Sequence, residues 1–147
     1  MSKLLFAILL LFTACSGSKN ITGGSLNTDL NEETLKECEH AYLSGANDVA
    51  EILMLLKNSG KFSLSMVILP QPLTEDEIEY IHTSGKWSQQ GNWITLTFKN
   101  RKLDLNALFD LNYADENQFR VVDERNVEIN DLPGELVIWG IGCERIK

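Results

Sequence analysis

The alternation of apolar and polar side chains is the feature that most restricts what this chain can fold into. Every second side chain in the segment 62–68 is large and apolar, namely Phe62, Leu64, Met66 and Ile68. The same period of two recurs in the segment 93–99, with threonines between Ile94, Leu96 and Phe98. Because successive side chains of a β-strand point to opposite faces of its sheet, both segments predict strands with one face in a core.

Short polar turns connect these segments to further segments of apolar or alternating character. The eight strands predicted in this way cover residues 51–57, 62–68, 79–88, 93–99, 102–111, 118–123, 126–130 and 135–146. Strands that follow one another in sequence usually pair, so we expect a mainly β fold, an antiparallel meander that forms a small barrel or half-barrel. The side chains expected to form its core, or to line a ligand cavity inside it, are Phe62, Leu64, Trp87, Ile94, Leu96, Phe98 and Phe109.

One α-helix is predicted before the sheet, over residues 31–43. The apolar side chains that would share one face of this helix are Leu35, Cys38, Ala41 and Tyr42. Asn31 is a favourable N-cap residue, and Glu32 and Glu33 would lie at the positive end of the helix dipole.

The first fifteen residues have the three parts of a secretory signal. Lys3 supplies a positive charge, an unbroken apolar run covers residues 4–12, and Thr13 and Ala14 lead into Cys15. The apolar run is too short to span a bilayer as a permanent helix. The chain is therefore expected to be exported.

The segment Phe12-Thr13-Ala14-Cys15 resembles the lipobox of bacterial lipoproteins. This resemblance implies that residues 1–14 are removed and that Cys15 carries the acyl chains that hold the protein in a membrane. Ser16 is not the aspartate that resembles an inner-membrane retention signal, which implies a place in the bacterial cell envelope, at the outer membrane and facing the periplasm. The alternative is an ordinary secretory signal that leaves a free Cys15.

The segment 15–30 is small, polar and rich in glycine, and it predicts a flexible tether. Residues 31–147 would then form a single domain that contains the helix and the sheet. The chain has a formal net charge of −8, which becomes −9 when Lys3 leaves with the signal. Nucleic-acid binding needs clustered basic side chains, so this composition argues against it. Anionic headgroups would repel such a chain, so the lipid has to provide the anchor.

Two neighbouring segments carry a second resemblance. The hairpin Leu55-Leu-Lys-Asn-Ser-Gly-Lys-Phe-Ser-Leu64 is followed by Ser84-Gly-Lys-Trp-Ser-Gln-Gln-Gly-Asn-Trp-Ile-Thr-Leu-Thr-Phe98. Together they are similar to the small lipocalin-like domains of bacterial lipoproteins, over residues 51–99. This resemblance implies a small barrel, and it implies that an arginine of the last strand, here Arg145, stacks on the tryptophan Trp87.

Cys38 and Cys143 remain once Cys15 is acylated. Exported proteins meet an oxidising compartment, so a disulfide between these two residues is expected, and it would link the predicted helix to the last strand. Two buried free thiols and a metal site are the alternatives.

Motifs for catalysis or for metal binding are not found in the sequence. The serines do not occur in a Gly-x-Ser-x-Gly elbow. The run Cys38-Glu39-His40 and the separate His82 lack the paired spacing of a soft-metal site. We therefore expect no enzymatic activity, no cofactor and no metal.

Two functional hypotheses follow. The first is a membrane-anchored, non-catalytic module that binds a small apolar ligand or an envelope protein. The second is a structural accessory lipoprotein whose barrel is filled and holds no ligand, and a metal-handling protein or an enzyme is a more distant third. The first two differ in whether the candidate core side chains line a cavity or fill the interior, and small barrels of eight strands do either.

Overall fold

The computed structural model describes residues 26, 30–70, 77–113 and 116–147. The expected signal over residues 1–14, the expected lipid-bearing Cys15 and most of the expected tether lie outside the described residues.

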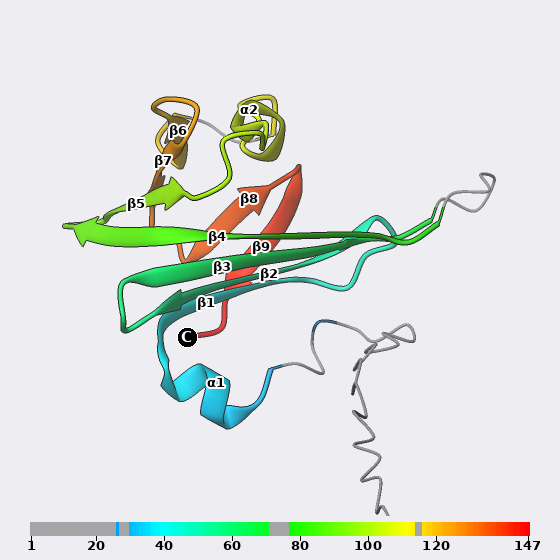
Figure 1. Ribbon diagram of the computed structural model, residues 1–147, viewed down its shortest axis with the longest axis horizontal. Helices are drawn as coiled ribbons and strands as arrows, with labels where there is room; N and C mark the ends of the chain where they lie inside the picture. The colour runs from blue at the N-terminus through cyan, green and yellow to red at the C-terminus, as the bar shows by residue number, and fades with distance from the viewer. Residues whose placement is uncertain (1–25, 27–29, 71–76, 114–115) are drawn as a thin grey trace, which may run out of the picture.

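A single antiparallel sheet forms the body of the protein (Figure 1). Its nine strands are β1 (Cys38–Ser44), β2 (Ala50–Lys57), β3 (Lys61–Ile68), β4 (Glu79–Gln90), β5 (Trp93–Phe98), β6 (Phe119–Val121), β7 (Asn126–Asn130), β8 (Glu135–Ile138) and β9 (Ile141–Arg145). Their spatial order is β6-β7-β5-β4-β3-β2-β1-β9-β8. The sheet curls into a half-barrel, which confirms the predicted mainly β fold class.

The strand order departs from a simple meander at two places. Strands β1 to β5 pair in sequence, but β5 then pairs with β7, and β6 lies at the edge beyond it. At the other side β1 pairs with β9, so that Tyr42 lies opposite Arg145 and Ser44 lies opposite Cys143. This long-range pairing joins the two ends of the domain and extends the curl of the sheet.

The concave side of the sheet holds the main core. Phe62, Leu64, Ile94, Leu96, Phe98 and Phe109 are all at most 2 % exposed, and all belong to one continuous cluster. Trp87 is partly buried and packs against that cluster. The ring centroids of Phe62 and Phe98 lie 4.9 Å apart with the rings at 74°, an edge-to-face contact. These side chains therefore form the core, as predicted.

The predicted N-terminal helix is much shorter than residues 31–43. Helix α1 covers only Glu32–Lys36, although Asn31 is its N-cap and accepts a hydrogen bond from the Thr34 amide at 2.8 Å. Residues from Cys38 onward belong to β1 instead. Strand β1 is covered on both faces, because Tyr42 points into the main core and Ala41 into a second cluster. A strand buried on both faces does not alternate, and its apolar spacing therefore mimicked that of a helix.

The prediction of a strand over 102–111 is wrong. That segment contains the short helix α2 (Leu105–Leu108), whose N-cap Asp104 accepts hydrogen bonds from the amides of Asn106 and Ala107. Leu105 and Leu108 are buried in the main core. The helix is joined to the β8–β9 turn, because the Trp139 amide donates to the Leu108 carbonyl at 2.6 Å. Four apolar residues in alternate positions, Leu103, Leu105, Ala107 and Phe109, predict a strand there, whereas the cap and the burial of Leu105 and Leu108 follow a helical spacing.

The predicted strand 135–146 is in fact two strands. Trp139 and Gly140 both have positive φ, 52° and 75°, and they form the two-residue turn between β8 and β9. Tight hairpin turns with two positive φ values fit the twist of the flanking strands. Tryptophan is an unusual residue for this conformation, which is why the sequence pattern did not reveal the turn.

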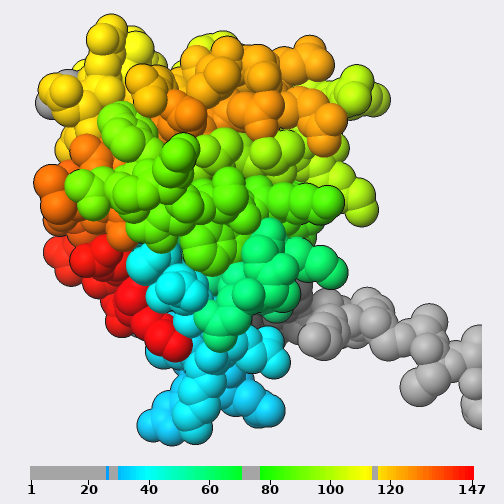
Figure 2. Space-filling view, turned by 90° about the vertical axis from the view of Figure 1, so that its left-hand side faces the viewer, coloured from blue at the N-terminus to red at the C-terminus, as the bar shows by residue number. Residues whose placement is uncertain are grey.

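A second, smaller apolar cluster lies on the convex side of the sheet, over β1 and β2. Its buried members are Cys38, Ala41, Leu53 and Leu55, and packed against them are Leu26, Leu30, Leu35 and Leu43. Leu26 also donates its amide hydrogen to Glu51 Oε2 at 2.7 Å. Leu26 and Leu30 were expected in the flexible tether, and the structure places them on the domain. Figure 2 shows α1 (cyan) below the C-terminal strand (red), where Lys147 Nζ donates to the Leu35 carbonyl at 2.6 Å.

The expected disulfide is absent from the structure, in which Cys38 and Cys143 are both buried free thiols. Cys143 lies opposite Ser44, and Cys38 is six residues from Ser44 on the same strand. At the rise of a strand this places the two cysteines about 20 Å apart, whereas a disulfide needs Cα atoms within roughly 7 Å. The two thiols also lie in clusters on opposite faces of the sheet.

The buried thiols generate a prediction about reactivity and alkaline stability. Burial raises the pKa of Cys143 from 9.0 to about 12, and the nearby Glu135 carboxylate acts in the same direction. Burial also raises the pKa of Cys38. A soluble chain that begins at Ser16 should therefore show no thiol reactive toward Ellman's reagent at pH 8 when folded, and two reactive thiols when unfolded.

The unfolded thiol ionises near its ordinary pKa while the folded one stays protonated. The free energy of unfolding should therefore fall as pH rises from about 9 to about 12, and this fall should be smaller in Cys143→Ala. Rapid labelling of the folded chain would contradict the burial of these thiols. Two thiols missing after unfolding without reductant would show a disulfide instead.

Candidate functional site

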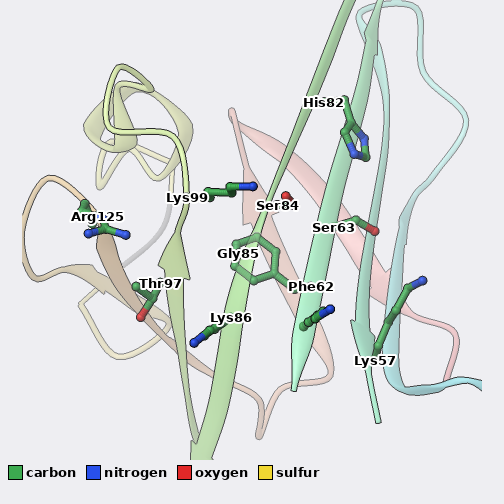
Figure 3. Close-up of a pocket in the computed structure, with 11 residues that line it drawn as sticks. Lys57, Phe62, Ser63, His82, Ser84, Gly85, Lys86, Thr97, Lys99 and Arg125 are labelled. Atoms are coloured by element: carbon green, nitrogen blue, oxygen red, sulfur yellow. The ribbon is translucent and has the colours of Figure 1, made fainter. Parts of the chain in front are cut away.

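An open depression of about 830 Å³ lies on the convex side of the sheet, over β3, β4 and β5 (Figure 3). We call it the outer depression. The residues that line it are Lys57, Lys61, Phe62, Ser63, His82, Ser84, Gly85, Lys86, Thr97, Lys99 and Arg125. It begins beside the α1 layer, because Lys57 follows Leu55 on the convex face of β2 and its ammonium group lies 4.0 Å from Glu37 Oε2.

The strand register explains why the surface is hollow there. Ser63 lies opposite Ser84 across β3 and β4, and Lys86 lies opposite Thr97 across β4 and β5. The side chains in the middle of this face are therefore short hydroxyl residues, and the long lysines stand around them. The small residues that fill the centre of a sheet face leave a hollow that their longer neighbours enclose.

Gly85 is required at the base of the outer depression. A Cβ atom added to Gly85 would lie 2.0 Å from the Thr97 carbonyl oxygen and 2.7 Å from Phe62 Cε1. No side chain fits between these atoms, since β4 and β5 approach closely here and the Phe62 ring occupies the core beneath. Gly85 therefore lets β4 and β5 approach each other and lets the core pack against the Phe62 ring.

Positive charge is concentrated in the outer depression. Five of the thirteen Lys and Arg residues of the chain line it, and none of the Asp and Glu residues that the structure describes does. Among the described residues, Lys61, Lys86, Lys99 and Arg125 have no carboxylate within 4.0 Å, and Lys57 has only the contact to Glu37. Arg125 donates from Nε to the Phe98 carbonyl at 3.1 Å, which holds its guanidinium at the rim. A basic hollow on an acidic protein is a local attractive field for anions.

A serine and a histidine meet beside the outer depression. Ser65 Oγ and His82 Nδ1 are 2.9 Å apart on the convex face. A nucleophilic serine needs a base that a third group orients. No contact of His82 with a carboxylate exists among the described residues, so this pair lacks that third group.

A second polar group of residues lies on the concave side, at one end of the half-barrel. The buried Tyr42 hydroxyl donates a hydrogen bond to Asp131 Oδ1, and Arg145 Nη1 donates to Asp131 Oδ2 at 2.7 Å. His40 Nε2 lies 3.9 Å from the same carboxylate and 3.2 Å from Gln89 Oε1. Burial and the hydrogen bond to Asp131 raise the pKa of Tyr42, which therefore stays protonated. These contacts tie β1, β4 and β9 to the end of β7.

Trp87 closes the same end of the half-barrel. Its Nε1 donates to the Lys57 carbonyl at 2.8 Å, and its ring lies 6.1 Å from the His40 ring, edge to face. The expected stacking of Arg145 on Trp87 is wrong, because Arg145 pairs with Asp131 instead. The cation–π contact in the structure is between Arg120 and Trp93, with Arg120 Cζ 4.5 Å from the ring centroid.

Cys38, Glu39, His40 and His82 do not come together. Cys38 lies under α1, His40 contacts the concave polar group, and His82 lines the outer depression. In the part of the chain that the structure describes, no three His, Cys, Asp or Glu side chains are grouped so that they could hold a metal ion.

The sequence analysis missed the outer depression, although the sequence holds a signal for it. The outward positions of the segments 61–65, 82–88 and 95–99 contain only lysine, serine, threonine and histidine. That regularity shows a basic strand face. The sequence does not show that Arg125 borders the same hollow as Lys57, because the place of Arg125 depends on the pairing of β5 with β7.

Comparisons with known proteins found no relatives. No protein-family model matches the chain, and no curated protein and no solved structure matches it either. Within the described residues, no helix is long and apolar enough to cross a membrane.

The concave polar group generates a prediction about stability. Replacing Asp131 with alanine leaves the buried Tyr42 hydroxyl without its acceptor and removes the partner of Arg145. The free energy of unfolding should fall by about 2–3 kcal/mol in a urea titration. Tyr42→Phe removes one hydrogen bond and keeps the ion pair, so the fall should be about 1 kcal/mol. Equal losses in the two variants would contradict a central role of Asp131.

Proposed function

We propose that this chain is a lipid-anchored lipoprotein of the bacterial cell envelope, held by Cys15 at the outer membrane and facing the periplasm. Its half-barrel serves as a non-catalytic binding module, and the binding site is on the convex face of the sheet. The sequence of the first fifteen residues supports the lipid anchor and the location. The hollow on the convex face and the packed concave face support the place of the binding site.

The observation that carries the proposal is the contrast between the two faces of the sheet. The candidate ligand-lining side chains on the concave face pack against each other, with Phe62, Leu64 and Phe98 at most 2 % exposed. The gap lined by Phe109, Phe119 and Leu136 has no space for a water molecule. The convex face, in contrast, carries a hollow of about 830 Å³, which is in the range of small-molecule sites. A ligand on the convex face is therefore better supported than an apolar ligand in the interior.

A structural accessory lipoprotein without a ligand is the second candidate. The packed interior favours it, because a filled half-barrel has no need of a ligand to be stable. The outer depression argues for the binding module, since four of its five cations have no carboxylate partner among the described residues. Unpaired like charges held together on one face are a cost to stability that a ligand would relieve.

The lipid anchor can be tested at Cys15. The wild-type chain expressed in a bacterium should incorporate labelled palmitate and sediment with the membranes. Cys15→Ala should lose the label and the membrane association, because the thiol is the attachment point. Cys38→Ala serves as the matched control and should keep both. A wild-type chain without label would overturn the lipoprotein proposal.

The packed interior can be tested with an apolar probe. A soluble chain that begins at Ser16 should give no saturable fluorescence change with a fluorescent fatty acid, since the side chains around Phe98 occupy the concave side. Saturable one-to-one binding would contradict a filled interior, and it would return the site to the concave face.

A further inference from the structure

The outer depression has a surplus of positive charge that the described part of the chain does not neutralise. Lys57 and Lys61 stand on the β2–β3 side, and Lys86, Lys99 and Arg125 stand on the β4–β5 side. Among the described residues, the carboxylate nearest to these cations is that of Glu37, whose Oε2 lies 4.0 Å from Lys57 Nζ, and both side chains are exposed. Such a contact is weak in water. Several cations around one hollow fit a ligand that carries more than one negative charge.

The other groups of the outer depression point to the chemistry of the anion. Three hydroxyl side chains lie between the cations, on Ser63, Ser84 and Thr97. In Figure 3 the Lys99 side chain extends toward the middle of the depression, beside Ser84. Lysine ammonium groups act as point charges for phosphate, and hydroxyl groups donate hydrogen bonds to its remaining oxygens. The Thr97 hydroxyl donates to Asn126 Oδ1 at 2.7 Å. The hydroxyl groups of Ser63 and Ser84 are therefore better placed than that of Thr97 to donate to a ligand.

The outer depression also lies on the face where the N-terminal segment reaches the domain. Leu26 packs over β1 and β2 on the convex side, and Lys57 at the edge of the depression contacts Glu37 just after α1. Eleven residues separate Cys15 from Leu26, a length of chain that reaches at most roughly 36–40 Å. If Cys15 is lipidated, the convex face stays within that distance of the lipid headgroups.

We infer that the outer depression binds a phosphate-bearing anion through Lys61, Lys86 and Lys99. This inference deepens the proposed function, on which it rests, by naming the ligand class of the same site. A lipid headgroup and a soluble phosphate compound share this chemistry, and the two arms of the experiment below distinguish them. The local charge also changes the expectation from composition, because a chain with a net charge of −8 still presents one basic face to an anionic surface.

The test uses the chain that begins at Ser16 and two probes. The soluble probe is inorganic pyrophosphate, measured by isothermal titration calorimetry. The membrane probe is a vesicle of phosphatidylglycerol and phosphatidylcholine, compared by co-sedimentation with a vesicle of phosphatidylcholine alone. We expect saturable binding to at least one anionic probe, and we expect it to weaken as salt is added. Binding to pyrophosphate supports a soluble ligand, and binding only to the anionic vesicle supports a headgroup.

The variants separate a built site from a general effect of charge. Lys86→Gln combined with Lys99→Gln removes two cations of the outer depression and should weaken binding at least tenfold. Lys36→Gln combined with Lys102→Gln makes the same change of charge on exposed lysines outside it, and should change binding less than twofold. Absence of binding in the wild type, or equal losses in both pairs, would overturn the inference.

A further variant tests the hydroxyl groups. Ser63→Ala combined with Ser84→Ala should weaken binding several-fold without a change in net charge, whereas Ser88→Ala on the exposed end of β4 should not. Failure of this inference is separate from failure of the proposed function. A wild-type chain that takes up no palmitate would overturn the anchor even if the soluble chain still binds phosphate. An anchored chain that binds neither probe would overturn only the ligand class.

Discussion

The structure depends on covering the concave side of one curled sheet. Buried side chains from eight strands and from α2 meet there in a single cluster, and the ring contacts among Phe62, Phe98, Phe109 and Phe119 continue through it. A half-barrel has two edge strands, here β6 and β8, so other elements have to cover the part of its core that a closed barrel would enclose. Helix α2 covers one end and is bonded to the β8–β9 turn through the Leu108 carbonyl, and Trp87 with the Asp131 contacts closes the other end.

The convex side of the sheet is covered only in part. The outward apolar residues of β1 and β2 are covered by α1 together with Leu26 and Leu30. Around the outer depression, β3, β4 and β5 carry hydroxyl residues and lysines outward, and the described residues form no layer over them there. The border between the covered and the uncovered part of the sheet lies at Lys57, which is where the outer depression begins. The candidate site is thus a consequence of how far the N-terminal layer extends.

The accuracy of the sequence predictions varied with the number of buried faces. Strands β3 and β5 were predicted within one residue, because one face of each is buried and the other is solvated. The apolar spacing of β1 predicts a helix because both faces of this strand are covered, and the segment of α2 predicts a strand because only four residues form the helix. The division of residues 135–146 into β8 and β9 depends on a tryptophan with positive φ, which local propensity does not favour.

The sequence by itself determined the mainly β class, the core residues on the concave face and the basic, hydroxyl-rich composition of the outward positions. These properties follow from the period of two, which is local. Only the tertiary structure decided that β5 pairs with β7, that β1 pairs with β9, and that Cys38 and Cys143 lie in separate clusters. Pairing between distant strands depends on which surfaces are left to bury after the local strands have formed. For that reason the hollow between Lys57 and Arg125 exists only in the folded sheet.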